Sequence, residues 1–574
     1  MKKNIRLLLI VLVSMWSTLA FSQGKKVTGV VADSTGSPLP GVTIKVKGTK
    51  VSALSDAQGN FSIALPLENG TLEFSSIGYS NKEVPATAGG NITVTLSSNT
   101  GQLNDVVVTG FGTRTNTRKL SYSVTEVKGS ELVKANNSNF VDALQGKVAG
   151  VYIAQGAGGP SSSAKIRIRG NSRLDPNTQP LVVIDGILIE PGTTGADSWG
   201  ANRDFGNIIK DLNPDDYESV TVLKGSAASA LYGSKALNGV LLITTKKGVA
   251  RKGLGVSVTH SESYDNAYKL PDLQNEYGGG TSTTFATDAQ GNRIVDQSAS
   301  ALVTPDAAFS YGPKFDGKPV KDLDGKTRPW VANNPLDFFQ TGKYINTNVA
   351  VEGGTDKSTF RFSYSNLYNN SVVPNNNLKR NSFDLRVTQK VSNNISLDAS
   401  INYTNNKIFN PIPQGGNYSP LFAFTYYMPR NAPIDDYLNN YTDPINGGRK
   451  KLDFGEGNDP YLLGYTFWNY FEINTLRNEN NLLANLDIHA NITPWLNLLV
   501  RSNINNYNDH TEIKTLGTGP NFTGGSYELD QNNYKNIRLQ TLLSLTKSIG
   551  KDFDLNASIG GEVYRNLGGN YTQA

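Results

Sequence analysis

From residue 254 onward, apolar and polar residues alternate along many segments of the chain. In residues 395–403, Ile, Leu, Ala, Ile and Tyr take every second position, with Ser, Asp, Ser and Asn between them. Residues 482–492 and 553–559 repeat this pattern. Successive side chains of a β-strand point to opposite faces, so a period of two predicts strands with one apolar and one polar face. Nine strands are predicted, near residues 254–264, 344–352, 358–368, 381–391, 395–405, 479–492, 495–507, 534–547 and 552–565.

The connections between these strands alternate in length. Long connections follow the first, fifth and seventh strands, at about 265–343, 406–478 and 508–533, and residues 369–380 follow the third. Short turns follow the second, fourth, sixth and eighth strands. Strands of about ten residues with short turns at one end and long loops at the other are typical of outer-membrane barrels. Residues 251–574 are therefore predicted to form the first part of an antiparallel transmembrane β-barrel.

Nine strands do not close such a barrel. Bacterial barrels have an even number of strands, and plugged transporters have about 22. An open sheet leaves unpaired backbone groups in lipid, which is very unfavourable. We therefore expect the chain to be the N-terminal part of a longer protein or a truncated gene product.

Tyrosines gather near the ends of the strands that lead into the long loops, where an aromatic girdle is expected. Three of them are in phase with the apolar face, and the other four need a register shift or face the barrel interior. The in-phase residues are Tyr264, Tyr368 and Tyr403, and the others are Tyr344, Tyr507, Tyr534 and Tyr564.

Two smaller regions precede the strand-rich part. Residues 25–96 contain short strands separated by turn signals such as 33–36 and 56–60, which predicts a β-sandwich. Residues 118–248 mix strand and helix patterns and predict a compact α/β unit. Its expected helices are 140–145 and 226–232, and its expected strands are 124–127, 151–153, 166–170, 180–186, 219–224 and 239–246.

The N-terminus has the form of a secretory signal. The basic residues Lys2, Lys3 and Arg6 precede an apolar run at residues 7–13, and small residues follow it. Such a segment is removed on export, and the apolar run is short for a membrane span. The predicted organisation is a signal peptide at 1–22, a sandwich at 23–98, a linker at 99–117, the α/β unit at 118–250 and the partial barrel at 251–574.

Composition excludes several kinds of chemistry. The chain has no Cys and three His among 574 residues, so thiolate metal sites, disulfides and Cys nucleophiles are absent. No spacing of His260, His489 and His510 matches a catalytic metal motif. The net charge of +5 includes three charges from the signal, which leaves too little to argue for nucleic acid. We expect no enzyme activity, no metal and no cofactor.

Three charged patterns in the α/β unit have simple explanations. Residues 225–235 are rich in Gly, Ser and Lys but lack phosphate-loop spacing. The adjacent carboxylates of Asp215 and Asp216 follow Asn-Pro, which is typical of a helix start. Arg167 and Arg169 alternate on one strand, and we expect them to pair with acids of a surrounding wall.

Residues 103–112 contain three consecutive valines flanked by Gly and Asn. Such a segment is either one more core strand or a strand that is added to the sheet edge of a partner. Its position before the α/β unit favours the second interpretation.

Taken in order, these motifs resemble those of TonB-dependent outer-membrane transporters of the SusC/RagA type. Residues 25–96 resemble the carboxypeptidase-regulatory-like domain of that type, and the α/β unit resembles its plug. The resemblance implies a TonB box formed by Asp105, Val106, Val107, Val108, Thr109 and Gly110. It also implies plug motifs at Arg167, Arg169, Gly170, Asp185, Gly186, Pro214, Lys224, Gly225, Tyr232 and Gly233.

The resemblance implies active import of an oligosaccharide or peptide across the outer membrane. The partners would be TonB with its ExbB/ExbD complex, a SusD-like surface lipoprotein and membrane lipid. A non-transporting surface receptor, adhesin or signal transducer is the alternative from another class, and a siderophore or haem transporter is a third.

Aromatic loop residues could stack on sugars, but ordinary packing is favoured for them: Tyr418, Tyr426, Tyr427, Trp468 and Tyr470.

Overall fold

The chain was analysed as a computed structural model, and its fold is mainly β. Contacts divide it into two compact units, Met1–Val107 with Arg114–Ser121 and Val108–Thr113 with Tyr122–Ala574. The predicted signal peptide lies outside the described residues. The structure describes residues 26–573 apart from 34–35, 50, 77–78, 80, 98–105, 109–113, 117–123, 135–138, 157, 171–178, 190–201, 226–227, 230–231, 297–309, 415–422, 425–427, 443–462, 517–524 and 551–552.

The first unit contains the predicted β-sandwich. One sheet has the strand order β4-β1-β7 and the other the order β3-β2-β5-β6. Alternate residues of β1 are buried, and the rings of Phe61 and Phe74 meet edge to face at 5.4 Å in the core. The strands are β1 (Lys26–Asp33), β2 (Thr43–Val46), β3 (Ser52–Leu54), β4 (Asn60–Ala64), β5 (Asn69–Ser75), β6 (Lys82–Thr87) and β7 (Asn91–Leu96).

The second unit begins with the α/β region, called the plug region below. Its main sheet has the order β10-β16-β17-β13-β14, and β11 pairs with β12 separately. β13 and β17 are buried along their whole length, which matches their continuous apolar sequences. The strands are β10 (Val124–Lys128), β11 (Val151–Gln155), β12 (Ala164–Ile168), β13 (Leu181–Ile184), β14 (Ile187–Ile189), β16 (Tyr217–Leu223) and β17 (Val240–Thr245).

Short helices connect the strands of the plug region. The helix expected at 140–145 is a single stretch of 3-10 helix, and the one expected at 226–232 lies largely outside the described residues. The expected helix start is confirmed, because Pro214 opens η5 and the Asn213 side chain accepts a hydrogen bond from the Asp215 amide. The helices are α2 (Gly129–Val133), η3 (Phe140–Leu144), η4 (Ile208–Asp211), η5 (Pro214–Asp216) and η6 (Gly233–Ala236).

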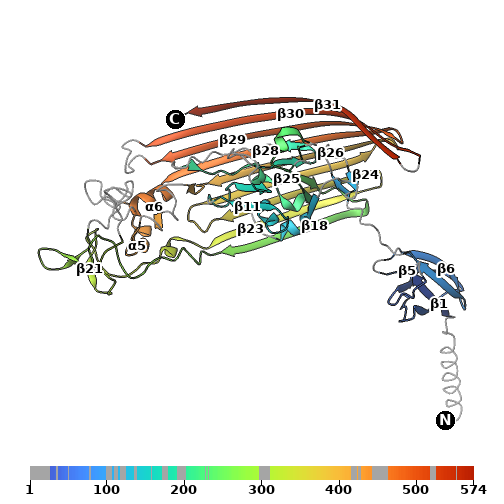
Figure 1. The fold of residues 1–574 in the computed structure, drawn as a ribbon, viewed down its shortest axis with the longest axis horizontal. Helices are drawn as coiled ribbons and strands as arrows, with labels where there is room; N and C mark the ends of the chain where they lie inside the picture. Colours follow the sequence, from blue (N-terminus) through green and yellow to red (C-terminus); the bar gives the residue numbers. More distant parts are fainter. Residues whose placement is uncertain are drawn as a thin grey trace, which may run out of the picture. The chain divides into compact units, whose positions relative to one another are not determined.

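The nine predicted strands form one antiparallel sheet in chain order, called the wall sheet below (Figure 1). Short turns and long loops alternate between them as expected. The strands are longer than the predicted ten residues, reaching 24 in β30. They are β18 (Arg251–Asp265), β23 (Gly342–Gly354), β24 (Ser358–Asn370), β25 (Asn377–Lys390), β26 (Ile395–Phe409), β28 (Ile473–Thr493), β29 (Leu496–Thr515), β30 (Ser526–Ile549) and β31 (Phe553–Gln573).

The two faces of the wall sheet are the reverse of those in a water-soluble sandwich. The face toward the plug region is polar and buried, with Arg361, Ser363 and Ser365 alternating on β24. The opposite face is apolar and exposed, and Phe362 and Leu385 lie side by side on it. A polar inner and apolar outer face are characteristic of strands that face lipid. No helix in the described residues has the length and apolar character that crossing a membrane requires.

Aromatic rings form a row on the exposed face. Tyr364, Phe383 and Tyr403 are neighbours across β24, β25 and β26, with ring centroids 4.9 and 6.3 Å apart. Tyr344 instead lies on the buried face and packs with Leu367. This is the interior-facing alternative that was expected for a tyrosine out of phase with the apolar face.

The long loops carry a separate apolar cluster. Phe338, Phe424 and Phe467 pack together there beside a small sheet of order β19-β20-β21-β22. Trp468 and Tyr470 are buried, in agreement with ordinary packing, whereas Tyr418, Tyr426 and Tyr427 lie outside the described residues. The elements are β19 (Ala286–Thr287), β20 (Arg293–Ile294), β21 (Pro319–Lys321), β22 (Thr327–Pro329), η8 (Pro335–Phe338), α5 (Ile434–Asn439) and α6 (Leu463–Phe471).

Candidate gating interface and TonB-box segment

The plug region meets the wall sheet through several buried ion pairs and hydrogen bonds. Two apolar contacts are also present among the described residues: Leu483 of the wall joins the plug core, and Phe205 of the plug region packs against a small buried cluster of the wall. Charges buried at such a contact are costly unless they are paired and hydrogen-bonded. The pairing of these charges therefore contributes strongly to how the plug region is held.

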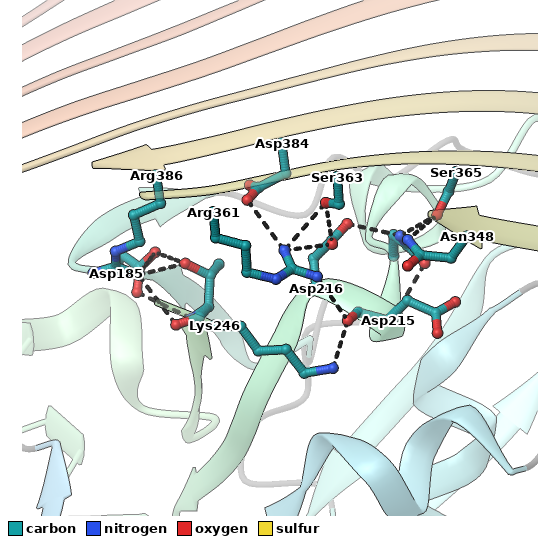
Figure 2. Close-up of polar contacts among 12 residues, drawn as sticks. Asp185, Asp215, Asp216, Lys246, Asn348, Arg361, Ser363, Ser365, Asp384 and Arg386 are labelled. Carbon is teal, nitrogen blue, oxygen red and sulfur yellow. Dashed lines mark hydrogen bonds and ion pairs between the residues drawn. The ribbon is translucent and has the colours of Figure 1, made fainter. Parts of the chain in front are cut away.

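The first contact is at the tight turn between β13 and β14. Asp185 and Gly186 have φ values of 47° and 88°, so both adopt the left-handed conformation. Thr245 Oγ1 donates to Asp185 Oδ2 at 2.6 Å and fixes the carboxylate. Arg386 Nη1 of the wall lies 2.9 Å from the same oxygen (Figure 2). Arg386 also donates to both oxygens of Asp398 at 2.9 Å, so one wall guanidinium joins a plug acid to a wall acid.

The second contact is at η5. Asp216 Oδ1 accepts hydrogen bonds from Arg361 Nη1 at 2.9 Å and from Ser363 Oγ at 2.5 Å (Figure 2). Arg361 also lies 3.7 Å from Asp384 of β25. These side chains are almost fully buried, so the pair is shielded from solvent.

Hydrogen bonds extend the second contact along the wall. Asn213 donates to Ser365 Oγ at 2.7 Å, and Asn346 donates to Asp215 Oδ2 at 3.0 Å. Lys246 donates to the Asp215 carbonyl at 2.7 Å (Figure 2). Burial raises the pKa of the Asp215 carboxyl and lowers the pKa of the Lys246 amine.

The third contact is at η4. Lys210 Nζ lies 2.8 Å from Asp211 Oδ1 and 2.5 Å from Glu479 Oε2 of β28. Burial disfavours the charged lysine, but the two carboxylates outweigh this effect and raise its pKa. Asn406 donates to Asp211 at 2.6 Å, and Arg380 donates to the Lys210 carbonyl. Both charges of the Lys210–Glu479 pair are therefore satisfied across the interface.

The sequence identified the plug side of these contacts better than the wall side. Asp185, Gly186 and Pro214 were predicted and lie at the interface. Lys210, Arg361, Arg386 and Glu479 were missed. The available signal was charge on the polar phase of a wall strand, as at Arg380, Asp384 and Arg386 of β25.

Several other predicted plug residues lie away from the described contacts. Within the described part of the chain, no ion pair joins Arg167 or Arg169 to an acid of the wall, so the expected pairing stays a prediction. Arg169 is exposed and has a φ of 60°, and Gly170 follows it at 82°. Arg169 and Gly170 therefore shape a turn after β12.

The remaining predicted plug residues surround a second turn. Gly225 has a φ of 62°, and its carbonyl accepts from the Ala228 amide at 3.0 Å. Lys224 is half-buried just before it. Tyr232 packs beside a small apolar cluster, and Gly233, with a φ of 71°, begins η6. We assign these residues no contact with a ligand.

The predicted TonB box is extended where it is described. Residues Val106–Val108 form strand β8, which pairs with β9 (Arg114–Asn116) in a two-stranded sheet. Asp105, Thr109 and Gly110 lie outside the described residues. The valines therefore have the backbone conformation that strand addition requires.

Comparison with known families identifies both N-terminal regions. Residues 116–240 match the TonB-dependent receptor plug domain. Residues 27–108 match the CarboxypepD_reg-like domain. Along most of its length, the chain is 28% identical to the TonB-dependent receptor SusC of Bacteroides thetaiotaomicron, over 95% of this chain and 50% of that receptor. The chain is a homologue of the TonB-dependent receptor SusC.

Another receptor is similar to this chain in sequence, and a solved structure is similar to it in fold. The TonB-dependent receptor P3 of Formosa agariphila is 31% identical over 62% of this chain and 30% of that receptor. The RagAB peptide importer in its closed-closed state has the same fold, with a TM-score of 0.57 and 19% identity over 79% of this chain and 49% of that chain. This SusC homologue thus spans about half the length of the SusC and RagAB chains that it matches.

Proposed function

We propose that the chain takes part in TonB-dependent import of a nutrient across the outer membrane. The observation that carries this proposal is the polar interface between the plug region and the wall sheet. Ion pairs such as Asp185–Arg386 and Asp216–Arg361 can exchange their partners for water when the plug moves. An apolar interface would lose the whole free energy of burial when its surface became exposed to water. A polar interface is therefore suited to a plug that is held firmly and yet released.

The energy for release would come from TonB, driven by its ExbB/ExbD complex. TonB would add a strand to residues 105–110, with backbone hydrogen bonds supplying the affinity. Force on this segment would pass through the linker to β10, the edge strand of the plug sheet. The plug would rearrange and open a path beside the wall.

The cargo in this proposal is an oligosaccharide or a peptide, and the site of action is the outer membrane. The likeness to SusC and to the structure named as a peptide importer supports this range. The long loops, which pack around a buried aromatic cluster, would present a folded surface to a SusD-like lipoprotein. SusC and P3 are named as receptors, which supports a role without catalysis.

The test is a substitution in the TonB box of the full-length protein at its native locus. Val107→Pro removes a backbone N–H and blocks strand pairing, while Val107→Ala keeps the N–H and serves as the matched control. Growth of the source bacterium on a panel of oligosaccharides and peptides is measured for each variant. We expect growth on the imported nutrient to be lost only with proline.

Binding at the cell surface distinguishes the alternative of a non-transporting receptor. An importer retains surface binding of the nutrient in the Val107→Pro variant and loses uptake. Unchanged uptake with proline would overturn the proposal. A growth defect restricted to iron-poor medium would favour the siderophore or haem alternative.

A further inference from the structure

The exposed face of the wall sheet changes from apolar to polar at one row of residues. On the consecutive strands β24, β25 and β26 (Figure 1), the apolar part ends at Tyr364, Phe383 and Tyr403. The next position of that face toward the long loops is an asparagine on each strand. The row continues in register on the next three strands and consists of Asn366, Asn381, Asn405, Asn480, Asn508 and Asn533.

Hydrogen bonds link the asparagine row to itself and to the tyrosines beside it. Tyr364 OH and Asn366 Nδ2 both donate to Asn381 Oδ1, at 2.9 and 2.8 Å. Asn405 Nδ2 donates to Asn480 Oδ1 at 2.9 Å. Among the described residues, the Asn381 Nδ2 group has no acceptor. A polar group without a partner is costly in hydrocarbon, and tyrosines are enriched at the membrane boundary, so the asparagine row fits the headgroup region.

Two lysines lie one position beyond the asparagine row. Lys379 of β25 and Lys407 of β26 are exposed and directly opposite each other. In the phase of the exposed face, they are the charged residues of β24, β25 and β26, three strands that the structure describes throughout.

The lysine pair has no carboxylate to neutralise it. The acids of these strands, Asp384 and Asp398, lie on the buried face beside arginines. Neither Lys379 nor Lys407 forms an ion pair with any other carboxylate in the described part of the chain. Like charges directly opposite each other on neighbouring strands are destabilising, and an anion bound between them would remove this repulsion.

The position of the lysine pair indicates which kind of anion fits. Phe362, Leu385 and Ile401 form an exposed apolar surface on the same strands, beyond the aromatic row. The Tyr368 ring lies beside the pair, with its centroid 5.5 Å from Lys379 Nζ. A phospholipid carries its phosphate at the polar boundary and its acyl chains on the apolar side, so it matches both the lysines and the apolar surface. A soluble anion would match the lysines alone.

We propose that Lys379 and Lys407 bind the phosphate of a membrane lipid in the leaflet on the side of the long loops. The acyl chains of this lipid lie on the apolar surface of β24, β25 and β26, and Asn381 Nδ2 donates a hydrogen bond to its headgroup. The proposal rests on the membrane location of the wall sheet and not on import, so TonB has no part in it. The wall thus holds one lipid at a defined place.

The test uses photoreactive lipids and the full-length protein purified from native outer membranes, with its native lipids exchanged for detergent. The two probes are phosphatidic acid and diacylglycerol with identical photoreactive acyl chains, so they differ only in the phosphate. Mass spectrometry measures the cross-linked peptides from residues 358–409. We expect phosphatidic acid to label these strands at least fivefold more than diacylglycerol. An excess of inorganic phosphate should not reduce this labelling, because free phosphate lacks acyl chains.

Substitution of both lysines tests whether their charge is responsible. Lys379→Gln with Lys407→Gln should reduce the preference for phosphatidic acid at least threefold. Lys379→Arg with Lys407→Arg should retain it, since arginine also pairs with phosphate. Lys269→Gln with Lys314→Gln is the matched control, because it removes the same charge from side chains that are 67% and 68% exposed outside the wall strands. Thermal melting checks the fold of each variant.

Several outcomes would overturn the proposal. They are equal labelling by the two lipids, an unchanged preference in the glutamine variant, an equal loss in the control variant and competition by inorganic phosphate. Uptake is not measured, so the result does not depend on import. Unchanged uptake in Val107→Pro would contradict only the import function.

Discussion

At the scale of single residues, a few buried charges decide how firmly the plug region is held. Arg386 joins Asp185 of the plug to Asp398 of the wall, and Lys210 joins η4 to Glu479. Removing one partner of a buried pair leaves the other charge unpaired, which costs roughly 3–5 kcal/mol. An exposed pair contributes only about 0–1 kcal/mol. The interface is therefore sensitive to single substitutions that would be silent on a surface.

The clearest case is Arg361, which faces both Asp216 and Asp384. Arg361→Gln leaves two buried carboxylates without this cation, so we expect the docked plug to lose about 3 kcal/mol. Urea-dependent cleavage of the plug region by a protease, in the purified full-length protein, measures this loss. The matched control is Arg538→Gln, which breaks a wall-only pair with Glu562 that is partly exposed. Equal sensitivity of the two variants would contradict the anchoring role of Arg361.

Glycine at the Asp185 turn provides a second prediction. A Cβ on Gly186 would lie 2.0 Å from Arg501 Nη1 of the wall, and the φ of 88° is also unfavourable for alanine. Gly170 has a similar φ of 82°, but a Cβ added there would have no described atom within 4 Å. Gly186→Ala should therefore lower the melting temperature clearly more than Gly170→Ala. Equal shifts would mean that strain alone, and not the close approach of the wall, makes glycine necessary at 186.

At the scale of elements, the period of two was sufficient to find the wall strands. The alternation predicted all nine strands and their order of connection, because each strand has one apolar and one polar face. Their length was underestimated, because the alternation fades toward the loops while backbone pairing continues, as in β30. Partners across the interface were not predictable, since Asp185 and Arg386 are far apart in sequence and meet only in the folded unit.

The outward face of the wall leads to a prediction about lipid. Leu385 is 39% exposed and lies between Phe362 and Ile401 on neighbouring strands. An arginine on a lipid face costs roughly 2–4 kcal/mol near the bilayer centre. Leu385→Arg should therefore reduce the amount of protein recovered in the outer membrane.

Tyr311→Arg serves as the control for this lipid prediction, because Tyr311 is 73% exposed in a loop outside the wall strands. It should leave the recovered amount unchanged. Normal recovery of the Leu385→Arg variant would indicate that this face is in contact with water or protein.

At the scale of the whole molecule, the two compact units have separate cores. Among the described residues, the sandwich core consists of residues between Val27 and Leu96, and none of its members comes from the second unit. A core of this size is close to the lower limit for an independent domain. The sandwich should therefore melt as its own transition, which also tests the predicted boundary at 98.

Phe74→Ala tests this independence. Phe74 is fully buried against Phe61, and truncating such a ring costs roughly 3–5 kcal/mol, which is enough to unfold a marginal domain. Calorimetry of the full-length protein should show the smaller transition lost and the larger one unchanged. Leu54→Ala, at a position 66% exposed on β3, is the control that should leave both transitions in place. A shift of both transitions by Phe74→Ala would mean that the two units unfold together.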